Sequence, residues 1–329
     1  MLATILTLDD VLTVTTGNST KNVTFSVPIS YPNDMAGIGP FPVIIAFDEL
    51  LLPRPPSVAV ITLNVSAIAE QDGPGSRGKG LFYDLYGADA TAGALMAWAW
   101  AVSRVLDALE VTPAMAGRID AARVAVTGCS RNGKGALVAG AFDERIALTV
   151  PQESGAGGDA CWRVSRALAA DDGLAAQTAA QVTAENVWFG RVFDVFARDR
   201  DGVGLLPVDH HELAALIAPR GLYSTSNIGF PWPGGQSSFQ CMTAANAAFR
   251  ALGAAGNQGF SEDGPHARCA FPADQQGELQ AFYEKFLFGR DVDTGVLRTA
   301  TNGSFDPSWV PWKTPVLVAG ATFRNASED

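Results

Sequence analysis

Short apolar runs recur along the chain and predict the strands of one sheet. Residues 41–47 and 58–63 are almost continuously apolar, as strands buried on both faces are. Residues 146–151 repeat that pattern after a turn. Residues 2–32 instead alternate Thr, Val, Ser and Ile around a Gly-Asn turn at 17–18, which is typical of antiparallel strands. We therefore expect a mostly parallel sheet with an antiparallel edge.

Helical periodicity fills the segments between these runs and after them. It predicts helices at residues 90–110, across 161–196, at 239–252 and at 275–288. Alternation of strands and helices implies an α/β fold in which helices cover both faces of the sheet, a three-layer sandwich. We expect residues 71–87 to form a glycine-rich loop, residues 256–271 to form a functional loop, and the tail to be irregular.

Composition limits the number of domains and the kinds of partner. The 329 residues are 47% hydrophobic and 17% charged, and no linker or repeat interrupts them, so we expect residues 1–329 to form a single domain. A net charge of −11 argues against nucleic acid and anionic membrane surfaces as partners. The apolar helix at 90–110 contains Arg104 and Asp107, which favours a core helix over a membrane span. We expect a monomer.

Two sequence features favour an oxidising, extracellular compartment. The chain has four cysteines, which allow three disulfide pairings. Five Asn-x-Ser/Thr acceptors for glycosylation occur, at Asn18, Asn22, Asn64, Asn302 and Asn325. Together they predict a secreted glycoprotein, although no signal peptide follows Met1. No Cys-x-x-Cys motif or His/Cys cluster occurs, so we expect neither a metal site nor an organic cofactor.

Ser130 is the candidate nucleophile. It follows a β-branched apolar run that ends at Gly128, and a small-residue helix begins near Gly133. A serine on a sharp strand-to-helix turn is raised off the sheet, beside the positive end of the helix dipole. The match to G-x-S-x-G is imperfect because Asn132 holds the second glycine place, but Asn tolerates a tight turn. The alternative is an ordinary serine N-cap.

A serine hydroxyl needs a base, and the base needs an orienting acid. Of the three histidines, His266 lies in a late loop, where the histidine of an α/β-hydrolase falls. His210 and His211 lie at a helix start, which favours structural roles. Glu153 follows the strand next to that of Ser130 and is the candidate acid. Asp209 is the rival acid, but a capping box with a glutamate three residues later explains it.

Several motifs resemble those of the fungal glucuronoyl esterases, carbohydrate esterase family 15. They are residues 128–136 (Gly-Cys-Ser-Arg-Asn-Gly-Lys-Gly-Ala), 151–155 (Pro-Gln-Glu-Ser-Gly), 161–163 (Cys-Trp-Arg), 82–87 (Phe-Tyr-Asp-Leu-Tyr-Gly), 209–211 (Asp-His-His) and 215–221 (Ala-Leu-Ile-Ala-Pro-Arg-Gly). The resemblance covers nearly the whole chain. It implies a secreted α/β-hydrolase that cleaves esters joining the 4-O-methyl-glucuronate of xylan to lignin alcohols.

The resemblance also assigns roles to individual residues. Ser130 matches the family nucleophile, Glu153 the acid, and Arg131 the arginine that helps to hold the oxyanion. The residues that match the sugar-binding set are Lys134, Gln177, Glu185 and Trp232. Gln177 matches only after a one-residue insertion, and Trp232 also requires a short insertion. The cysteines would pair as Cys129 with Cys269 and Cys161 with Cys241.

Arg268 departs from the family pattern. It stands where the family has its catalytic histidine, and His266 matches the other histidine of that motif. Because arginine stays protonated, it cannot act as a general base. Either His266 serves through a rearranged loop, or the chain is an impaired or inactive esterase that still holds the sugar. A serine esterase with another substrate is a third possibility.

Residues 48–51 (Asp-Glu-Leu-Leu) are a second departure from the family pattern, and they lie near the expected site.

Overall fold

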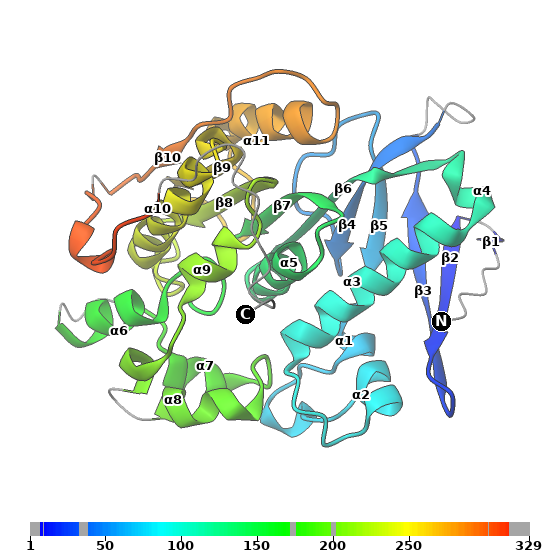
Figure 1. The fold of residues 1–329 in the computed structure, drawn as a ribbon, viewed down its shortest axis with the longest axis horizontal. Helices are drawn as coiled ribbons and strands as arrows, with labels where there is room; N and C mark the ends of the chain where they lie inside the picture. Colours follow the sequence, from blue (N-terminus) through cyan, green and yellow to red (C-terminus); the bar gives the residue numbers. More distant parts are fainter. Residues whose placement is uncertain are drawn as a thin grey trace, which may run out of the picture.

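One sheet organises the protein, which is described here from a computed structural model covering residues 7–8, 10–32, 39–171, 176–198, 202–301 and 303–315. Within these residues ten strands follow the spatial order β1-β2-β3-β5-β4-β6-β7-β8-β9-β10 (Figure 1). The strands are β1 (Thr7–Leu8), β2 (Val11–Gly17), β3 (Asn22–Ser30), β4 (Phe41–Phe47), β5 (Ala59–Leu63), β6 (Ile119–Cys129), β7 (Ile146–Gln152), β8 (Gly221–Asn227), β9 (Gln258–Asp263) and β10 (Leu297–Arg298).

The sheet is antiparallel at one edge and parallel elsewhere, as the hydrophobic pattern predicts. β1, β2 and β3 pair antiparallel, and β3 also pairs antiparallel with β5. From β5 through β10 every pairing is parallel. Every residue of β4 is buried, whereas β3 alternates buried and exposed positions. Parallel strands are covered on both faces, and an edge hairpin is covered on one.

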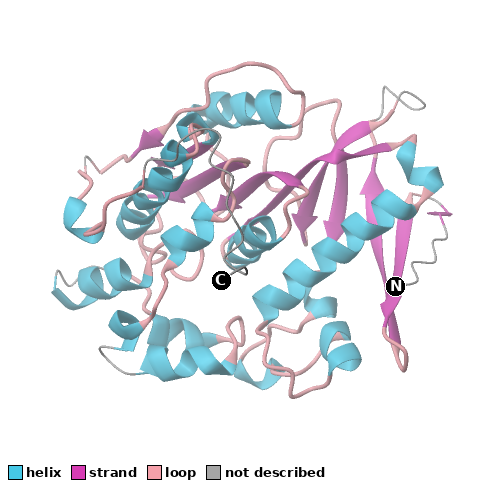
Figure 2. Ribbon diagram, viewed as in Figure 1, coloured by secondary structure: helices cyan, strands magenta, loops and turns pink. Residues whose placement is uncertain are grey.

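Helices cover both faces of this sheet (Figure 2). The longer ones are α3 (Ala94–Val111), α5 (Arg131–Phe142), α6 (Trp162–Asp171), α10 (Gly235–Ala251) and α11 (Ala273–Phe286); shorter ones are α1 (Val65–Ile68), α2 (Leu81–Tyr86), α4 (Pro113–Ala116), α7 (Ala179–Glu185), α8 (Asp194–Arg198) and α9 (His210–Ala215). Val43 and Ile45 of β4 pack in one core with Trp98 of α3. Ile44, between them, packs in another core with Phe282 of α11. Alternate residues of one strand therefore face opposite helix layers, which confirms the three-layer α/β fold.

Three expectations for local structure are corrected. Residues 256–271 are not all loop, because Gln258–Asp263 forms β9. Polar side chains of β9 accept from other elements: Gln275 Nε2 donates to Ser261 Oγ at 3.3 Å, and Asn246 Nδ2 donates to Gln258 Oε1 at 2.8 Å. Residues 71–87 contain the 3-10 turn Pro74–Ser76 and helix α2, so they are only partly loop. The tail adds the short strand β10 and the 3-10 turn Pro307–Trp309.

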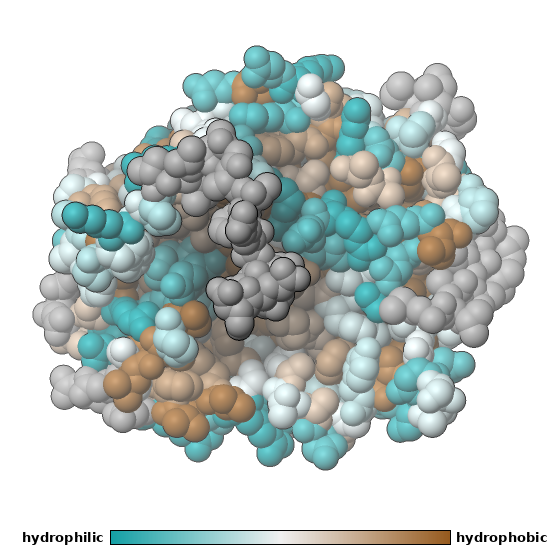
Figure 3. All heavy atoms as spheres, in the orientation of Figure 1, coloured by the Kyte–Doolittle hydropathy of each residue, from teal (hydrophilic) through white to brown (hydrophobic). Residues whose placement is uncertain are grey.

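The expected helical stretch at 161–196 is broken into α6, α7 and α8, with the 3-10 turn Arg191–Phe193 before α8. Trp162 and Trp188 are buried in the core rather than free for a ligand. Val192 and Val195 are exposed, and apolar surface gathers around α8 in Figure 3. None of the described helices is both long and apolar enough to span a bilayer.

Candidate active site

Ser130 lies on a strained turn between β6 and α5. Its backbone has φ 58° and ψ −123°, outside the conformations that non-glycine residues favour. Ser130 N donates to Gln152 O at 2.8 Å, and Lys134 N donates to Ser130 O at 3.1 Å. The side chain caps none of the N–H groups of α5, so the geometry is that of a nucleophile turn and not of a serine N-cap.

Two glycines make this turn possible. A Cβ at Gly128 would lie 2.6 Å from the carbonyl carbon of Asn132, and one at Gly133 would lie 2.8 Å from Gln152 O. Both approaches are too close for any side chain. The glycine needed after the serine is therefore Gly133, which explains why Asn132 is accepted at the preceding position.

Asn132 instead ties the start of α5 to the loop after β4. Its Nδ2 donates to Phe47 O at 3.1 Å and to Asp48 Oδ2 at 2.9 Å. Asp48 Oδ1 accepts from Val65 N at 3.0 Å. The unusual segment that begins with Asp48 thus connects β4, α1 and the nucleophile turn.

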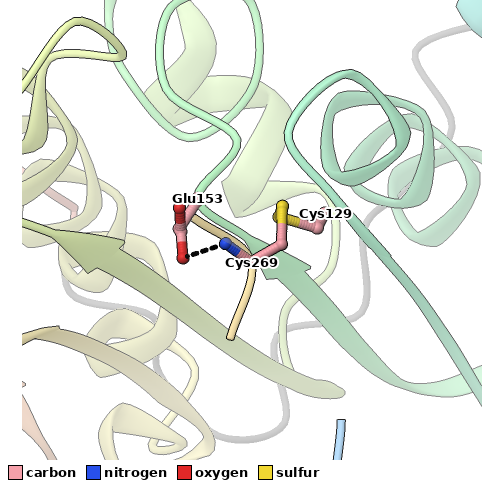
Figure 4. Close-up of side chains that lie close together, drawn as sticks. All are labelled: Cys129, Glu153 and Cys269. Carbon is pink, nitrogen blue, oxygen red and sulfur yellow. Dashed lines mark hydrogen bonds between the residues drawn. A yellow bond between two sulfur atoms is a disulfide. The ribbon is translucent and has the colours of Figure 1, made fainter. Parts of the chain in front are cut away.

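Glu153 lies beside this turn, directly after β7. It has φ 45°, and it is 4% exposed. Its Oε1 accepts from Cys269 N at 3.0 Å (Figure 4). Burial raises the pKa of Glu153, and the Cys269 N–H opposes this effect only in part.

The Cys129–Cys269 disulfide joins the nucleophile strand to the late loop (Figure 4). Cys161 pairs with Cys241, so both pairings implied by the resemblance are confirmed. Among the described residues, Cys129, Glu153 and Cys269 are the group with ligand-type atoms close enough to share a metal ion. The sulfurs of the two cysteines are bonded to each other, so these residues offer no thiolate to a metal ion.

The late loop brings Arg268, not His266, onto the nucleophile. Arg268 Nη2 donates to Ser130 Oγ, and its Cζ lies 4.7 Å from the centre of the Phe230 ring. His266 Nδ1 lies 3.9 Å from Glu153 Oε1 and 2.9 Å from Ala267 O. His266 Nε2 is buried and has no hydrogen-bond partner among the described residues. The imidazole is therefore next to the acid, while the guanidinium is next to the hydroxyl.

Three of the residues expected to bind a sugar are joined by hydrogen bonds, and the fourth, Lys134, has other partners. Gln177 Nε2 donates to Glu185 Oε2 at 2.7 Å, and Gln177 N donates to Trp232 O at 3.0 Å. Trp232 is 39% exposed, so its indole is free to stack on a ligand. Lys134 is buried in α5, and its Nζ donates to Ser154 O at 2.6 Å and Ala156 O at 2.5 Å. Burial lowers its pKa to about 8.

Arg131 follows Ser130 and is exposed. Its guanidinium makes no hydrogen bond or ion pair with the parts of the chain that the structure describes.

Asp209, His210 and His211 have structural roles, as expected. Asp209 Oδ1 accepts from Trp162 N and His210 N, both at 2.8 Å, and Glu212 completes a capping box. His210 Nδ1 donates to Gly158 O at 2.6 Å, and burial lowers its pKa. His211 stacks on Trp312 with ring centres 5.1 Å apart.

Three residues that support the site were missed in the sequence. Asp159 is buried, and its Oδ1 accepts from Gly155 N at 2.6 Å and Ser238 Oγ at 2.9 Å. Asn227 Nδ2 donates to His266 O at 3.0 Å, and Phe230 lies under Arg268. Asn227 ends β8 at the carboxyl edge of the sheet, a position that could have marked it. Nothing in the sequence marks Asp159 or Phe230.

Known proteins resemble this chain over most of its length. The sequence model of a family described as glucuronyl esterase, fungi, matches residues 14–253. A 4-O-methyl-glucuronoyl methylesterase of Hypocrea jecorina is 49% identical over 306 residues, which are 93% of this chain and 64% of the relative. This chain thus spans less than two thirds of that relative's length.

Two solved structures share the fold. The glucuronoyl esterase catalytic domain from Hypocrea jecorina has a TM-score of 0.91 and 48% identity, covering 96% of this chain and 85% of that one. A variant glucuronoyl esterase from Sporotrichum thermophile, in complex with methyl 4-O-methyl-β-D-glucopyranuronate, has a TM-score of 0.88 and 45% identity. The match covers 94% of this chain and 81% of that one.

Proposed function

Since the chain belongs to the fungal glucuronoyl esterase family of carboxylic ester hydrolases, we propose that it cleaves esters between the 4-O-methyl-D-glucuronate of glucuronoxylan and lignin alcohols. The observation that carries this proposal is the strained turn that raises Ser130 beside a buried glutamate. The bound methyl 4-O-methyl-glucuronate of the S. thermophile relative supports the sugar class.

In the proposed reaction Ser130 Oγ attacks the ester carbonyl and forms an acyl-enzyme. His266 takes the hydroxyl proton and gives it to the departing alcohol, and Glu153 stabilises the imidazolium. Arg131 donates to the oxyanion. Water then attacks the acyl carbon, so that free uronic acid leaves and Ser130 regains its proton. Lys134, Gln177, Glu185 and Trp232 hold the sugar.

This route requires His266 to replace Arg268 on Ser130 Oγ. Two observations support it: His266 Nδ1 lies 3.9 Å from Glu153 Oε1, and Nε2 has no hydrogen-bond partner among the described residues. Both side chains belong to one short loop, and their exchange requires that loop to rearrange.

A second candidate function is binding of glucuronoxylan with little or no hydrolysis. The contact of Arg268 with Ser130 Oγ favours it. In that arrangement a permanent cation occupies the place of a base, and the hydroxyl has no acceptor for its proton.

Hydrolysis of benzyl 4-O-methyl-glucuronate by four proteins distinguishes these functions. They are the unchanged chain, Ser130→Ala, His266→Ala and Arg268→His. An esterase that uses His266 is active and loses about a thousandfold or more in kcat with either alanine variant. A binding protein is inactive, and Arg268→His raises its activity. If Ser130→Ala loses nothing and Arg268→His gains nothing, the assignment of the nucleophile is wrong.

Assays on acetyl and aryl esters test the substrate class. Faster hydrolysis of these than of glucuronate esters would point to a different serine esterase. We further infer that the protein is a secreted monomer. Two disulfides and exposed acceptors at Asn18 and Asn22 support an extracellular location.

A further inference from the structure

The guanidinium of Arg268 donates to Ser130 Oγ. It forms no ion pair with any residue that the structure describes. Some other arginines pair with acids: Arg145 contacts Asp107, Glu110 and Asp143, and Arg163 contacts Asp209. Arg220 instead donates to the backbone carbonyls of Asp143 and Ile146. Arg268 differs from both kinds because it donates to the hydroxyl of Ser130, so in a chain of net charge −11 it places a positive charge at the nucleophile.

The nearby carboxylates are occupied by other donors. Glu153 has a side chain only 3% exposed, and its Oε1 accepts from Cys269 N. Asp48 accepts from Val65 N and Asn132 Nδ2. Glu185 accepts from Gln177. The charge of Arg268 favours the ionised form of Glu153, but none of these carboxylates lies within ion-pair distance of Arg268, so none of them takes up its N–H donors.

Arg268 is also positioned to bind a planar anion. Its guanidinium lies over the Phe230 ring, which limits its orientation. The hydrogen bond to Ser130 Oγ uses one of its five N–H donors. The donors that remain match the two oxygens of a carboxylate in a bidentate pair, whereas an ester offers one carbonyl oxygen and no negative charge.

We propose that this site binds the free carboxylate of a uronic acid more tightly than the corresponding ester, because Arg268 pairs with the carboxylate at Ser130. The inference rests on the proposed function, since it takes the ligand to be a glucuronate held at the same site. It names the product acid, or xylan whose glucuronate side chains are not esterified, as the preferred ligand. An active enzyme of this kind is inhibited by its own acid product.

Calorimetric titration with two probes tests the proposal. The methyl glycoside of 4-O-methyl-glucuronic acid carries the charge, and its primary uronamide is a neutral analogue that an esterase does not consume. We expect the unchanged protein to bind the acid about tenfold or more tightly than the amide at pH 7. Arg268→Met should weaken acid binding about tenfold and change amide binding less than about twofold.

Two further variants complete the series. Arg268→Lys keeps the charge and loses the planar fork, so it should retain part of the preference for the acid. Arg250→Met removes an exposed guanidinium from the far end of α10 and should change neither affinity. Equal binding of acid and amide, equal weakening of both by Arg268→Met, or an equal effect of Arg250→Met would overturn the proposal.

Parallel assays of methyl ester hydrolysis separate this inference from the proposed function. Ester turnover without a preference for the acid refutes the inference alone. A preference for the acid without turnover supports the inference and refutes the esterase. Binding of neither probe refutes both the inference and the uronate site.

Discussion

The role proposed for Glu153 conflicts with its surroundings. A triad acid must be ionised to stabilise an imidazolium, yet burial raises the pKa of Glu153 and so favours its neutral form. Its conformation at φ 45° is also unusual for glutamate. The site therefore keeps a residue that the fold alone would not favour.

Replacing Glu153 with Gln should stabilise the protein and abolish hydrolysis. The amide oxygen can still accept from Cys269 N, and no charge is buried. Because the folded pKa lies above the unfolded one, the native state favours the protonated form, and ionisation destabilises it as pH rises through the folded pKa. We expect the free energy of unfolding of Glu153→Gln to exceed that of the unchanged chain by about 1 kcal/mol at pH 8, and not at pH 4.

Urea unfolding at the two pH values measures this difference. A variant that is less stable than the unchanged chain at pH 8 would show that the carboxylate stabilises the fold. Asp291→Asn, at an exposed position after α11, serves as a control for loss of one acidic charge.

Lys134 should make stability depend on alkaline pH. Burial lowers its pKa to about 8, whereas an unfolded lysine titrates near ~10.4. Between these values the unfolded state binds more protons, so the free energy of unfolding rises with pH. Lys134→Met should remove up to about 3 kcal/mol of that rise. Urea unfolding at pH 7.5 and 10 measures it, with the exposed Lys313→Met as control; equal rises in both variants would contradict the expectation.

The two disulfides join different kinds of element, although both close long loops. Cys129–Cys269 spans 140 residues and fixes the late loop to the nucleophile turn, whereas Cys161–Cys241 spans 80 residues and fixes α6 to α10. Loop closure entropy differs between them by only about 0.5 kcal/mol. Their effects on stability should therefore be similar and their effects on the site different.

Paired alanine substitutions test this expectation. Cys129→Ala with Cys269→Ala, and Cys161→Ala with Cys241→Ala, should each lower the free energy of unfolding by about 2 to 5 kcal/mol. Only the first pair should weaken binding of glucuronate or slow its hydrolysis in folded protein. Calorimetric titration and the ester assay measure this, and an equal functional loss in the second pair would show that the Cys129–Cys269 bond has no special role.

The sequence predicts best the strands and helices whose buried side chains are apolar. β4 and β7 appear as continuous apolar runs, and α3 and α5 follow from small and apolar residues. β9 was missed because Gln258–Asp263 has a single large apolar residue, Phe260, and its burial depends on polar contacts with other elements. Helix α2 was not predicted because glycines precede and follow it. Hydrogen bonds between distant segments of the chain leave no pattern in the local sequence.

The same distinction applies to the site. Local turn chemistry is enough to predict Ser130 and Glu153, and the resemblance places Arg268 at the position of a base. That Arg268 contacts Ser130 while His266 lies beside Glu153 depends on how the loop after β9 folds. Asp159 and Phe230 act through contacts across long sequence separations, so no spacing could identify them.

Across the whole molecule, protection of the backbone should decrease from the centre of the sheet to its antiparallel edge. β4, β6 and β7 lie between parallel neighbours under helices on both sides, while β2 and β3 have solvated faces. Local opening is easiest where few apolar contacts are lost. We expect amides of β2 and β3 to exchange about a hundredfold faster than those of β6. Hydrogen exchange with mass spectrometry measures this, and equal protection would show that the hairpin unfolds only with the core.

The cysteine pairing has a consequence for biosynthesis. The Cys161–Cys241 bond lies inside the segment that Cys129–Cys269 closes. Of the four cysteines in this sequence, Cys129 and Cys161 are synthesised before either of their partners, and they do not pair with each other. Oxidation at that stage would join a non-native pair, which thiol exchange or reduction must then undo. We therefore expect the yield of native protein to rise with a disulfide isomerase, or with an oxidant that acts after synthesis has passed residue 269.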